Sequence, residues 1–357
     1  MSHPYEFQPD AAFWRRAVAA LPPEAVNPAG VAPFHIAPGD AVVTAGSCFA
    51  QHIGPMLEAI RFNYLVTEAA HPLVDAGLAR RFNYGVFSAR YGNIYTARQL
   101  LQLIRRAYGA FQPAEDGWAL AGGGWVDPFR PQIQPGGFLS RREYELDRAR
   151  HFAAVREAFE RLDVFVFTLG LTEAWVSRVD GAVFTLCPGT AGGTFDPERH
   201  AFVNFTAEEV VADMTAFAEA LRRRNARAKL VLTVSPVPLV ATARPETHVL
   251  AATTYSKAVL RVAAEMLART LPGVMYFPAY EIIMSRAHDA GTYFGPDRRE
   301  VLGPGVAHVM RVFAESLAGL VVPAPAPAPA PLSGTAYTSE MAAAVQVNCD
   351  EVALDQG

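Results

Sequence analysis

Residues 41–50, AVVTAGSCFA, join a short apolar run directly to a helical pattern. The run at residues 41–45 has the length and composition of a strand that is buried on both faces. Apolar side chains at helical spacing then follow over residues 49–60. Gly46 permits a sharp turn between the two elements, so Ser47 is expected at the C-terminal edge of a sheet.

Three further apolar runs have the same character, and helical patterns lie between them. One of these patterns begins at the capping box Thr206 and Glu209, and another follows Pro304, which suits the first turn of a helix. Alternating strands and helices predict an α/β fold, with a parallel sheet covered by helices on both faces. The three runs are residues 164–168 (VFVFT), 229–234 (KLVLTV) and 274–277 (VMYF).

Composition excludes several classes of protein. The 357 residues are 51% hydrophobic and 18% charged with a formal net charge of −4, which excludes disorder, collagen and coiled coil. No basic run indicates nucleic-acid binding, and no apolar stretch approaches the roughly 20 residues of a membrane span. Three widely separated cysteines form neither a metal-site pattern nor a disulfide framework. We therefore expect a cytoplasmic protein without a metal site.

The chain divides into four predicted regions. Residues 1–39 are expected to pack on the core as an extension, and residues 40–320 to form the α/β domain. Alternating Pro and Ala in the spacer, residues 321–331, favour an extended conformation. The tail, residues 332–357, is expected either to be disordered or to dock on another surface, including that of a partner protein.

Two stretches interrupt the alternation of strands and helices. Residues 109–147 contain two tryptophans and three consecutive glycines, and residues 177–204 contain a hairpin-turn signal at residues 179–182. Both are predicted insertions. Insertions at the carboxyl ends of parallel strands would form the walls of a substrate pocket.

Ser47 has two interpretations from its local sequence. It is either the N-cap of the following helix or a nucleophile whose oxyanion would be stabilised by amides of the first helical turn. Cys48 is a rival nucleophile, because a thiol at a helix N-terminus has a lowered pKa. Consecutive residues at a tight turn point in different directions, so Cys48 is expected to pack beneath the turn.

The string Gly46-Ser47-Cys48-Phe49-Ala50 resembles the signature of the GSCFA domain family, whose members are similar to SGNH (GDSL-like) hydrolases. Further blocks resemble the family in the family's order, from about residue 40 to about residue 317. The resemblance implies a three-layer α/β/α, flavodoxin-like fold with Ser47 as nucleophile and no cofactor. The blocks are residues 82–85, 91–96, 168–173, 232–237, 255–258 and 276–281.

A catalytic serine needs a base, and here the chain departs from the SGNH pattern. That pattern places Asp and His three residues apart before the last helix, whereas this chain has Asp297 and Glu300. His248, after the strand that ends near Val237, is the first candidate base. His308 fits better as a helix-face residue. Alternatively, Glu300 is the base through a raised pKa, or hydrolysis has been lost.

The resemblance also suggests an oxyanion hole made by the Ser47 amide with Gly92 and Asn93. In the loop that starts at Gly170, Thr172 would donate to substrate and Glu173 would accept.

Two charged residues near this loop have alternative roles. Glu173 is equally consistent with an ion pair to Arg178 or Lys257. A Ser–Lys dyad would need a buried Lys257, whose charge is instead expected to face solvent or an acidic partner. The seven histidines other than His248 and His308 are expected to lie mostly on the surface or in loops.

These observations predict a serine esterase or O-acyltransferase that acts on a small O-acyl ester, with carbohydrate esters among the candidates. The alternative is a non-catalytic binding protein that uses the same cleft, because Glu300 stands where histidine is expected.

Overall fold

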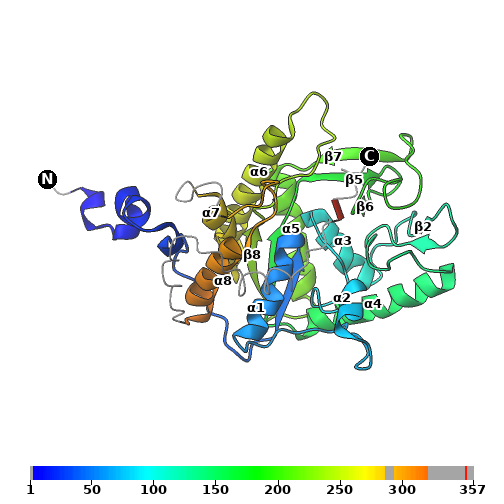
Figure 1. Ribbon diagram of the computed structural model, residues 1–357, viewed down its shortest axis with the longest axis horizontal. Helices are drawn as coiled ribbons and strands as arrows, with labels where there is room; N and C mark the ends of the chain where they lie inside the picture. Colours follow the sequence, from blue (N-terminus) through cyan, green and yellow to red (C-terminus); the bar gives the residue numbers. More distant parts are fainter. Residues whose placement is uncertain (1–2, 286–292, 321–349, 352–357) are drawn as a thin grey trace. The chain divides into compact units, whose positions relative to one another are not determined.

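The computed structural model describes residues 3–285, 293–320 and 350–351 (Figure 1). The predicted spacer, His288 and the rest of the predicted tail lie outside these residues. The chain forms two compact units, one of residues 1–37 and 277–346 and the other of residues 38–276 and 347–357. The four regions proposed from the sequence remain predictions.

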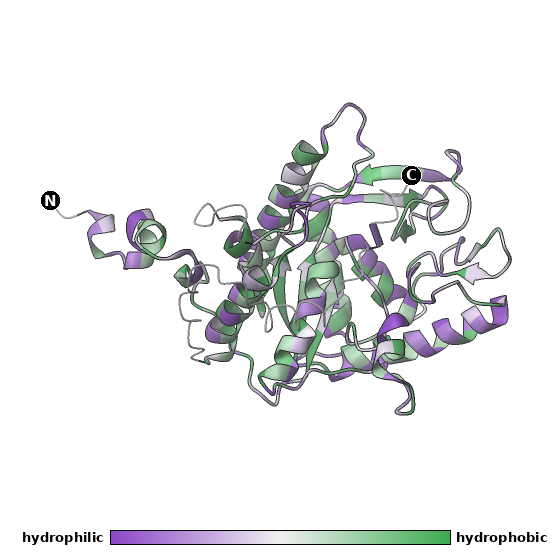
Figure 2. Cartoon of the chain, viewed as in Figure 1, coloured by the Kyte–Doolittle hydropathy of each residue, from purple (hydrophilic) through white to green (hydrophobic). Residues whose placement is uncertain are grey.

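The larger unit is built on a four-stranded parallel sheet in the order β1-β4-β8-β9. All four strands lie where the apolar runs predicted them, and nearly all of their residues are buried. Figure 2 shows this concentration of apolar residues along the central strands. The strands are β1 (Val42–Gly46), β4 (Val164–Leu169), β8 (Lys229–Val234) and β9 (Val274–Tyr276).

Helices flank this sheet, consistent with the predicted three-layer α/β/α fold (Figure 1). α6 packs against β8 and β9, and α5 packs against α3 and α6. The capping box at Thr206 and Glu209 starts α5 as predicted. The helices of this unit are the 3₁₀ helix η5 (Cys48–His52), α1 (Ile53–Ala59), α2 (Ala76–Arg81), α3 (Ala97–Ala107), α4 (Arg141–Arg161), α5 (Ala207–Arg222) and α6 (Val249–Thr270).

The two stretches predicted as insertions contain small antiparallel sheets. The first carries the pair β2 (Trp118–Ala119) and β3 (Trp125–Val126). The second supplies β6 (Val183–Phe184) and all of β7 (His200–Asn204), which flank β5 (Glu173–Ser177). The turn between β5 and β6 is the predicted hairpin, and Gly181 adopts a positive φ of 71° there.

The smaller unit contains short helices and one long helix. Pro304 lies in the first turn of the long helix, as predicted. Within this unit His308 is buried: its Nδ1 lies 2.8 Å from the Tyr293 hydroxyl and its Nε2 lies 2.8 Å from the Val26 carbonyl oxygen. The helices are η1 (Pro4–Phe7), η2 (Asp10–Ala12), η3 (Arg15–Ala19), η4 (Pro23–Ala25), α7 (Ala279–Met284) and α8 (Gly303–Ala318).

Within the described ranges, no helix combines the length and the hydropathy that crossing a bilayer requires.

Gly46, the last residue of β1, lies opposite Thr168 of β4 and has a φ of 140°. A Cβ atom at this position would lie 2.4 Å from the Thr168 carbonyl oxygen, which belongs to a rigid buried strand. We expect Gly46→Ala to lower the free energy of unfolding by about 2 kcal/mol or more, measured by urea denaturation.

The matched control is Gly39→Ala, because a Cβ there meets no atom within 4 Å. It should change stability by less than about 0.5 kcal/mol. Equal stability of the two variants would contradict the steric argument at Gly46.

Candidate functional site

Ser47 follows β1 and is the N-cap of η5. Its backbone N–H donates to the Thr168 carbonyl at 3.2 Å. The sequence predicts a helix from residue 49, but the first turn is 3₁₀ and the α-helix begins at Ile53. Pro55 explains the difference, because proline has no N–H to bond the carbonyl four residues before it and its ring clashes with that carbonyl.

The Ser47 hydroxyl is enclosed and has no hydrogen-bond partner in the described structure. An N-cap serine normally accepts a hydrogen bond from an amide of the first turn, but Ser47 makes no such bond. Ser47 does stand at the end of β1 as predicted, yet its side chain is only 3% exposed instead of open at the sheet edge. Gly170 packs closely on it: a Cβ on Gly170 would lie 2.9 Å from the Ser47 Cβ.

Three loops meet around Ser47, and all three belong to the segments that resemble the family. The Ile94 N–H donates to the Gly46 carbonyl at 2.8 Å. The Tyr95 carbonyl in turn accepts from the N–H groups of Gly170 and Leu171, at 3.0 and 2.9 Å. The structure therefore brings Ser47, the loop at residues 92–95 and the loop after β4 together.

Asn93, predicted to help bind an oxyanion, contacts the C-terminal tail. Its side-chain amide donates to the Asp350 carboxylate at 2.8 Å, and its side-chain carbonyl accepts from Gln51 at 3.0 Å. The Asp350 N–H donates to the Tyr95 hydroxyl at 3.2 Å. Gly92, with a φ of 65°, lines a cavity of about 10 Å³ beside these groups. The described part of the tail thus lies directly on a predicted site residue.

Thr172 and Glu173 are held by neighbouring side chains. The Thr172 hydroxyl donates to the side chain of Asn204 at 2.6 Å. Glu173 accepts from the Thr242 hydroxyl at 2.7 Å and from the Ala243 N–H at 3.4 Å. Its carboxylate therefore bonds to the loop before α6, and within the described part of the chain it forms an ion pair with neither Arg178 nor Lys257.

Lys257 is buried, which makes the solvent-facing prediction wrong. Its ammonium group donates to the Gly170 carbonyl at 2.7 Å. Gly170 also packs on Ser47, so a buried cation and the predicted nucleophile share one neighbour. The helical periodicity of α6 places Lys257 on the buried face with Leu260 and Ala264, but the charge of lysine argued for exposure.

The candidate base His248 belongs to the larger unit, whereas Asp297 and Glu300 belong to the smaller one. His248 is the exposed N-cap of α6, and its Nδ1 accepts from the Leu250 N–H at 3.1 Å. Asp297 and Glu300 belong to the smaller unit, where Asp297 accepts from the N–H groups of Arg299 and Glu300. Burial raises the pKa of Asp297, but these two hydrogen bonds outweigh it and the pKa is lowered. The catalytic roles of these residues remain predictions.

A buried ionic cluster lies next to this site, and sequence reasoning missed it. Arg130 pairs with Asp127 at 2.7 Å and with Asp147 at 2.9 Å, and Arg90 pairs with Asp147 at 2.8 Å. All four side chains are at most 17% exposed. The sequence gives little sign of this cluster, because isolated charged residues are ordinarily expected on the surface.

His151 on α4 belongs to the same region and is 1% exposed, so the expectation of a surface position is wrong for this residue. Its Nδ1 lies 2.7 Å from the Glu68 carboxylate. Burial raises the pKa of Glu68, but His151, Arg130 and the Arg90 N–H outweigh it and lower the pKa. Burial lowers the pKa of His151, followed in size by the positive charge of Arg130.

The protein-family model of the GSCFA family matches residues 41–313 of the chain. None of the curated proteins compared matches the chain. The matched range begins one residue before β1 and includes Ser47, Asn93, Gly170 and Lys257. Because this match spans well over half of the 357 residues, the chain belongs to the GSCFA family.

Proposed function

We propose that this GSCFA protein is a serine hydrolase or O-acyltransferase with Ser47 as its nucleophile. The observation that carries the proposal is the Ser47 hydroxyl, which is buried and makes no hydrogen bond in the described structure. A buried polar atom without a partner costs about 1–3 kcal/mol, and such atoms call for an explanation in native proteins. A hydroxyl that serves catalysis provides one.

In the proposed reaction the Ser47 oxygen bonds to the acyl carbon of a small O-acyl ester, with carbohydrate esters as candidates. A base takes the hydroxyl proton, and the alcohol of the ester leaves with a proton. Water then hydrolyses the acyl-enzyme, or an acceptor hydroxyl takes the acyl group. Amides near Ser47 and Gly92 would receive the negative charge of the intermediate. No cofactor is required, and the three scattered cysteines suit a cytoplasmic location.

His248 remains the first candidate for the base because it follows β8, whose carboxyl end lies at the same sheet edge as that of β1. Its Nδ1 accepts the Leu250 N–H, which favours a proton on Nε2. In this tautomer neither ring nitrogen has a free lone pair. The imidazole must therefore rotate, or transfer its Nε2 proton to Nδ1 through solvent, before it can accept the proton of Ser47. Lys257 is a second candidate, because it is buried and contacts Gly170, which packs on Ser47.

A fluorophosphonate probe tests the nucleophile. We expect the wild-type protein to gain one covalent adduct that maps to the peptide containing Ser47, as measured by mass spectrometry. Ser47→Ala should gain none, whereas Cys48→Ala should keep the adduct. Labelling that persists in Ser47→Ala, or a wild-type protein inert to probes and to model acetyl esters, would contradict the proposal.

The same assay tests the base. Removing a general base costs about 10²–10⁴ in rate, so His248→Gln should slow labelling by at least about 100-fold. The matched control is His71→Gln, because His71 is also exposed and its Nδ1 also accepts an N–H two residues ahead, from Leu73. If His248→Gln labels as fast as the control, the base is another residue, with Lys257→Met as the next variant to assay.

The second candidate function is a non-catalytic binding protein that uses the same cleft. Glu300 in the position of the expected histidine favours it. So does the low exposure of Ser47, 3%, because a substrate must reach a nucleophile. A binding protein would be inert to the probe and would lose no ligand affinity in Ser47→Ala. An enzyme would instead lose labelling in that variant.

A further inference from the structure

The tail contributes two described residues to the larger unit, and both are buried. Asp350 and Glu351 are 4% and 6% exposed, and they form the short red segment of Figure 1. Asp350 is 257 positions from Asn93 and 255 from Tyr95, the two residues that it contacts. Closing so long a loop costs conformational entropy, so specific contacts must offset it.

Asp350 is bound through both its side chain and its backbone. Its carboxylate accepts from the Asn93 side-chain amide at 2.8 Å and from the Tyr95 hydroxyl at 3.5 Å. Its N–H donates to the same Tyr95 hydroxyl at 3.2 Å. Gln51 donates to the side-chain carbonyl of Asn93 at 3.0 Å, which leaves the amide of Asn93 directed at Asp350. A carboxylate is costly to bury without donors, and these residues supply them.

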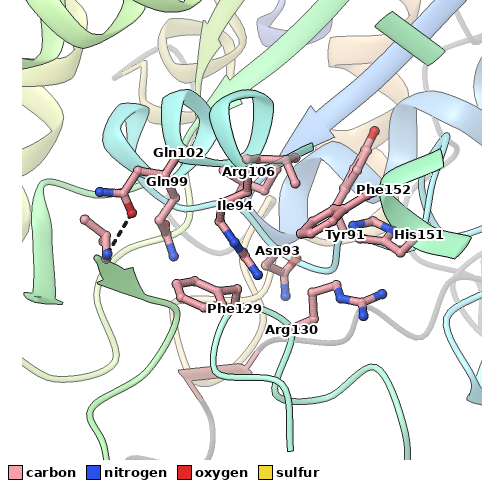
Figure 3. Close-up of a pocket in the computed structure, with 12 residues that line it drawn as sticks. Tyr91, Asn93, Ile94, Gln99, Gln102, Arg106, Phe129, Arg130, His151 and Phe152 are labelled. Carbon is pink, nitrogen blue, oxygen red and sulfur yellow. Dashed lines mark hydrogen bonds between the residues drawn. The ribbon is translucent and has the colours of Figure 1, made fainter. Parts of the chain in front are cut away.

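The contact coincides with the predicted oxyanion hole. Asn93 is predicted to donate to the oxyanion, and such donors lie about 2.7–3.1 Å from the negative oxygen. The Asp350 oxygen at 2.8 Å falls within that range, and a carboxylate carries a negative charge of the same kind. In Figure 3 the side chain of Asn93 points between Phe129 and Arg130. The tail therefore occupies the donor that the reaction intermediate would need.

The space left beside this contact is too small for a substrate. Asn93, Gly92, Arg130 and Asp350 are among the residues that line a cavity of about 10 Å³. A single water molecule needs at least about 10–15 Å³ of such volume, and an acyl group needs more. A substrate can reach the Asn93 amide only after Asp350 has left it.

We propose that the tail is an intramolecular inhibitor, in which the Asp350 carboxylate takes the place of the oxyanion at Asn93. This inference rests on the proposed function, because it assumes that Asn93 serves a reaction at Ser47. The loop at residues 92–95 bonds to the backbone of Gly46, next to Ser47, so the tail and the nucleophile lie against one loop. The protein is inactive while the tail is docked and active once it is released.

Hydrogen exchange followed by mass spectrometry measures the docking without any turnover. We expect the Asp350 amide to exchange at least about tenfold more slowly than in a free peptide of residues 345–357, because its N–H donates to Tyr95. Asp350→Ala should lose this protection, since its side chain cannot accept from Asn93. Asp355→Ala is the matched control, because it removes the same charge from the tail and should keep the protection. Exchange in the wild type as fast as in the free peptide would overturn the proposal.

The fluorophosphonate assay measures the inhibition. Asp350→Ala should label at Ser47 about tenfold faster than the wild type, a factor that corresponds to about 1.4 kcal/mol of docking free energy. Asp355→Ala should label at the wild-type rate. An unchanged rate in Asp350→Ala would overturn the inhibition and leave Ser47 as the nucleophile. A slower rate would also overturn it, because the tail would then complete the site.

The two measurements separate this proposal from the catalytic one. No labelling in either the wild type or Asp350→Ala would contradict catalysis and inhibition together, and protection of the Asp350 amide would then show docking alone. Tyr95→Phe provides a second variant, because it removes the hydroxyl that contacts Asp350 and keeps the ring that packs on Leu171 and Leu239. It should also lose the protection at Asp350, and full protection in this variant would contradict the contact.

Discussion

Arg130→Met should lower the free energy of unfolding by about 3–5 kcal/mol, as measured by urea denaturation at neutral pH. The Asp127 carboxylate is 1% exposed and lies 2.7 Å from Arg130. Without the guanidinium it keeps the Phe129 N–H as donor but loses its cation. A buried charge that loses its partner is among the few changes that destabilise a protein this strongly.

The double variant Asp127→Asn with Arg130→Met separates the loss of a partner from the loss of packing. It removes both charges, so it should be less destabilised than the sum of the two single variants. Arg142→Gln is the surface control, since its side chain is exposed on α4. A loss for Arg130→Met no larger than for this control would show that the buried pair does not support the fold.

Acidification from pH 6.5 to pH 4 should destabilise the protein, and His52 should account for about 3 kcal/mol of the loss. Burial, and then the charge of Arg80, lowers the pKa of His52 from 6.5 to about 4. The unfolded chain binds a proton at this position below pH 6.5, whereas the folded chain does so only below about pH 4. The stabilisation is therefore complete above pH 6.5 and is lost progressively toward pH 4.

Urea unfolding at several pH values between 7.5 and 4 measures this loss. In His52→Gln the decrease in stability over this range should be smaller than in the wild type by about 3 kcal/mol. His151 titrates in the same direction, so part of the decrease should remain. An identical pH dependence in both proteins would mean that folding does not lower the pKa of His52.

The sheet could be predicted from the sequence because its signals are local. Each apolar run is bounded by polar residues or glycine, and its short length and its β-branched and aromatic residues distinguish it from a buried helix. The start of α5 was equally clear, since Thr206 and Glu209 satisfy each other's backbone amides. The position of Ser47 at the end of β1 followed from the same reasoning, whereas the enclosure of its hydroxyl depends on Gly170, more than a hundred residues later.

The polar interior could not be predicted because its contacts link residues that are far apart in the chain. Glu68 and His151 are 83 positions apart, and Lys257 meets the Gly170 carbonyl across 87. Arg106 follows Arg105, and nothing local tells which of the two is buried. A hint was available in α3, where Leu103, Ile104 and Ala107 define an apolar face that includes position 106.

The pairing of β1 with β4 sets the order in which this protein can mature during synthesis. Gly46 meets Thr168, and the loop that carries Asn93 is held partly by amides at positions 170 and 171. A nascent chain that ends before residue 164 therefore contains Ser47 but lacks β4 and the amides of residues 170 and 171 that position its surroundings. Until the ribosome has released that segment, the apolar residues of β1 lack their neighbouring strand β4, and this is the interval when a chaperone would be needed most.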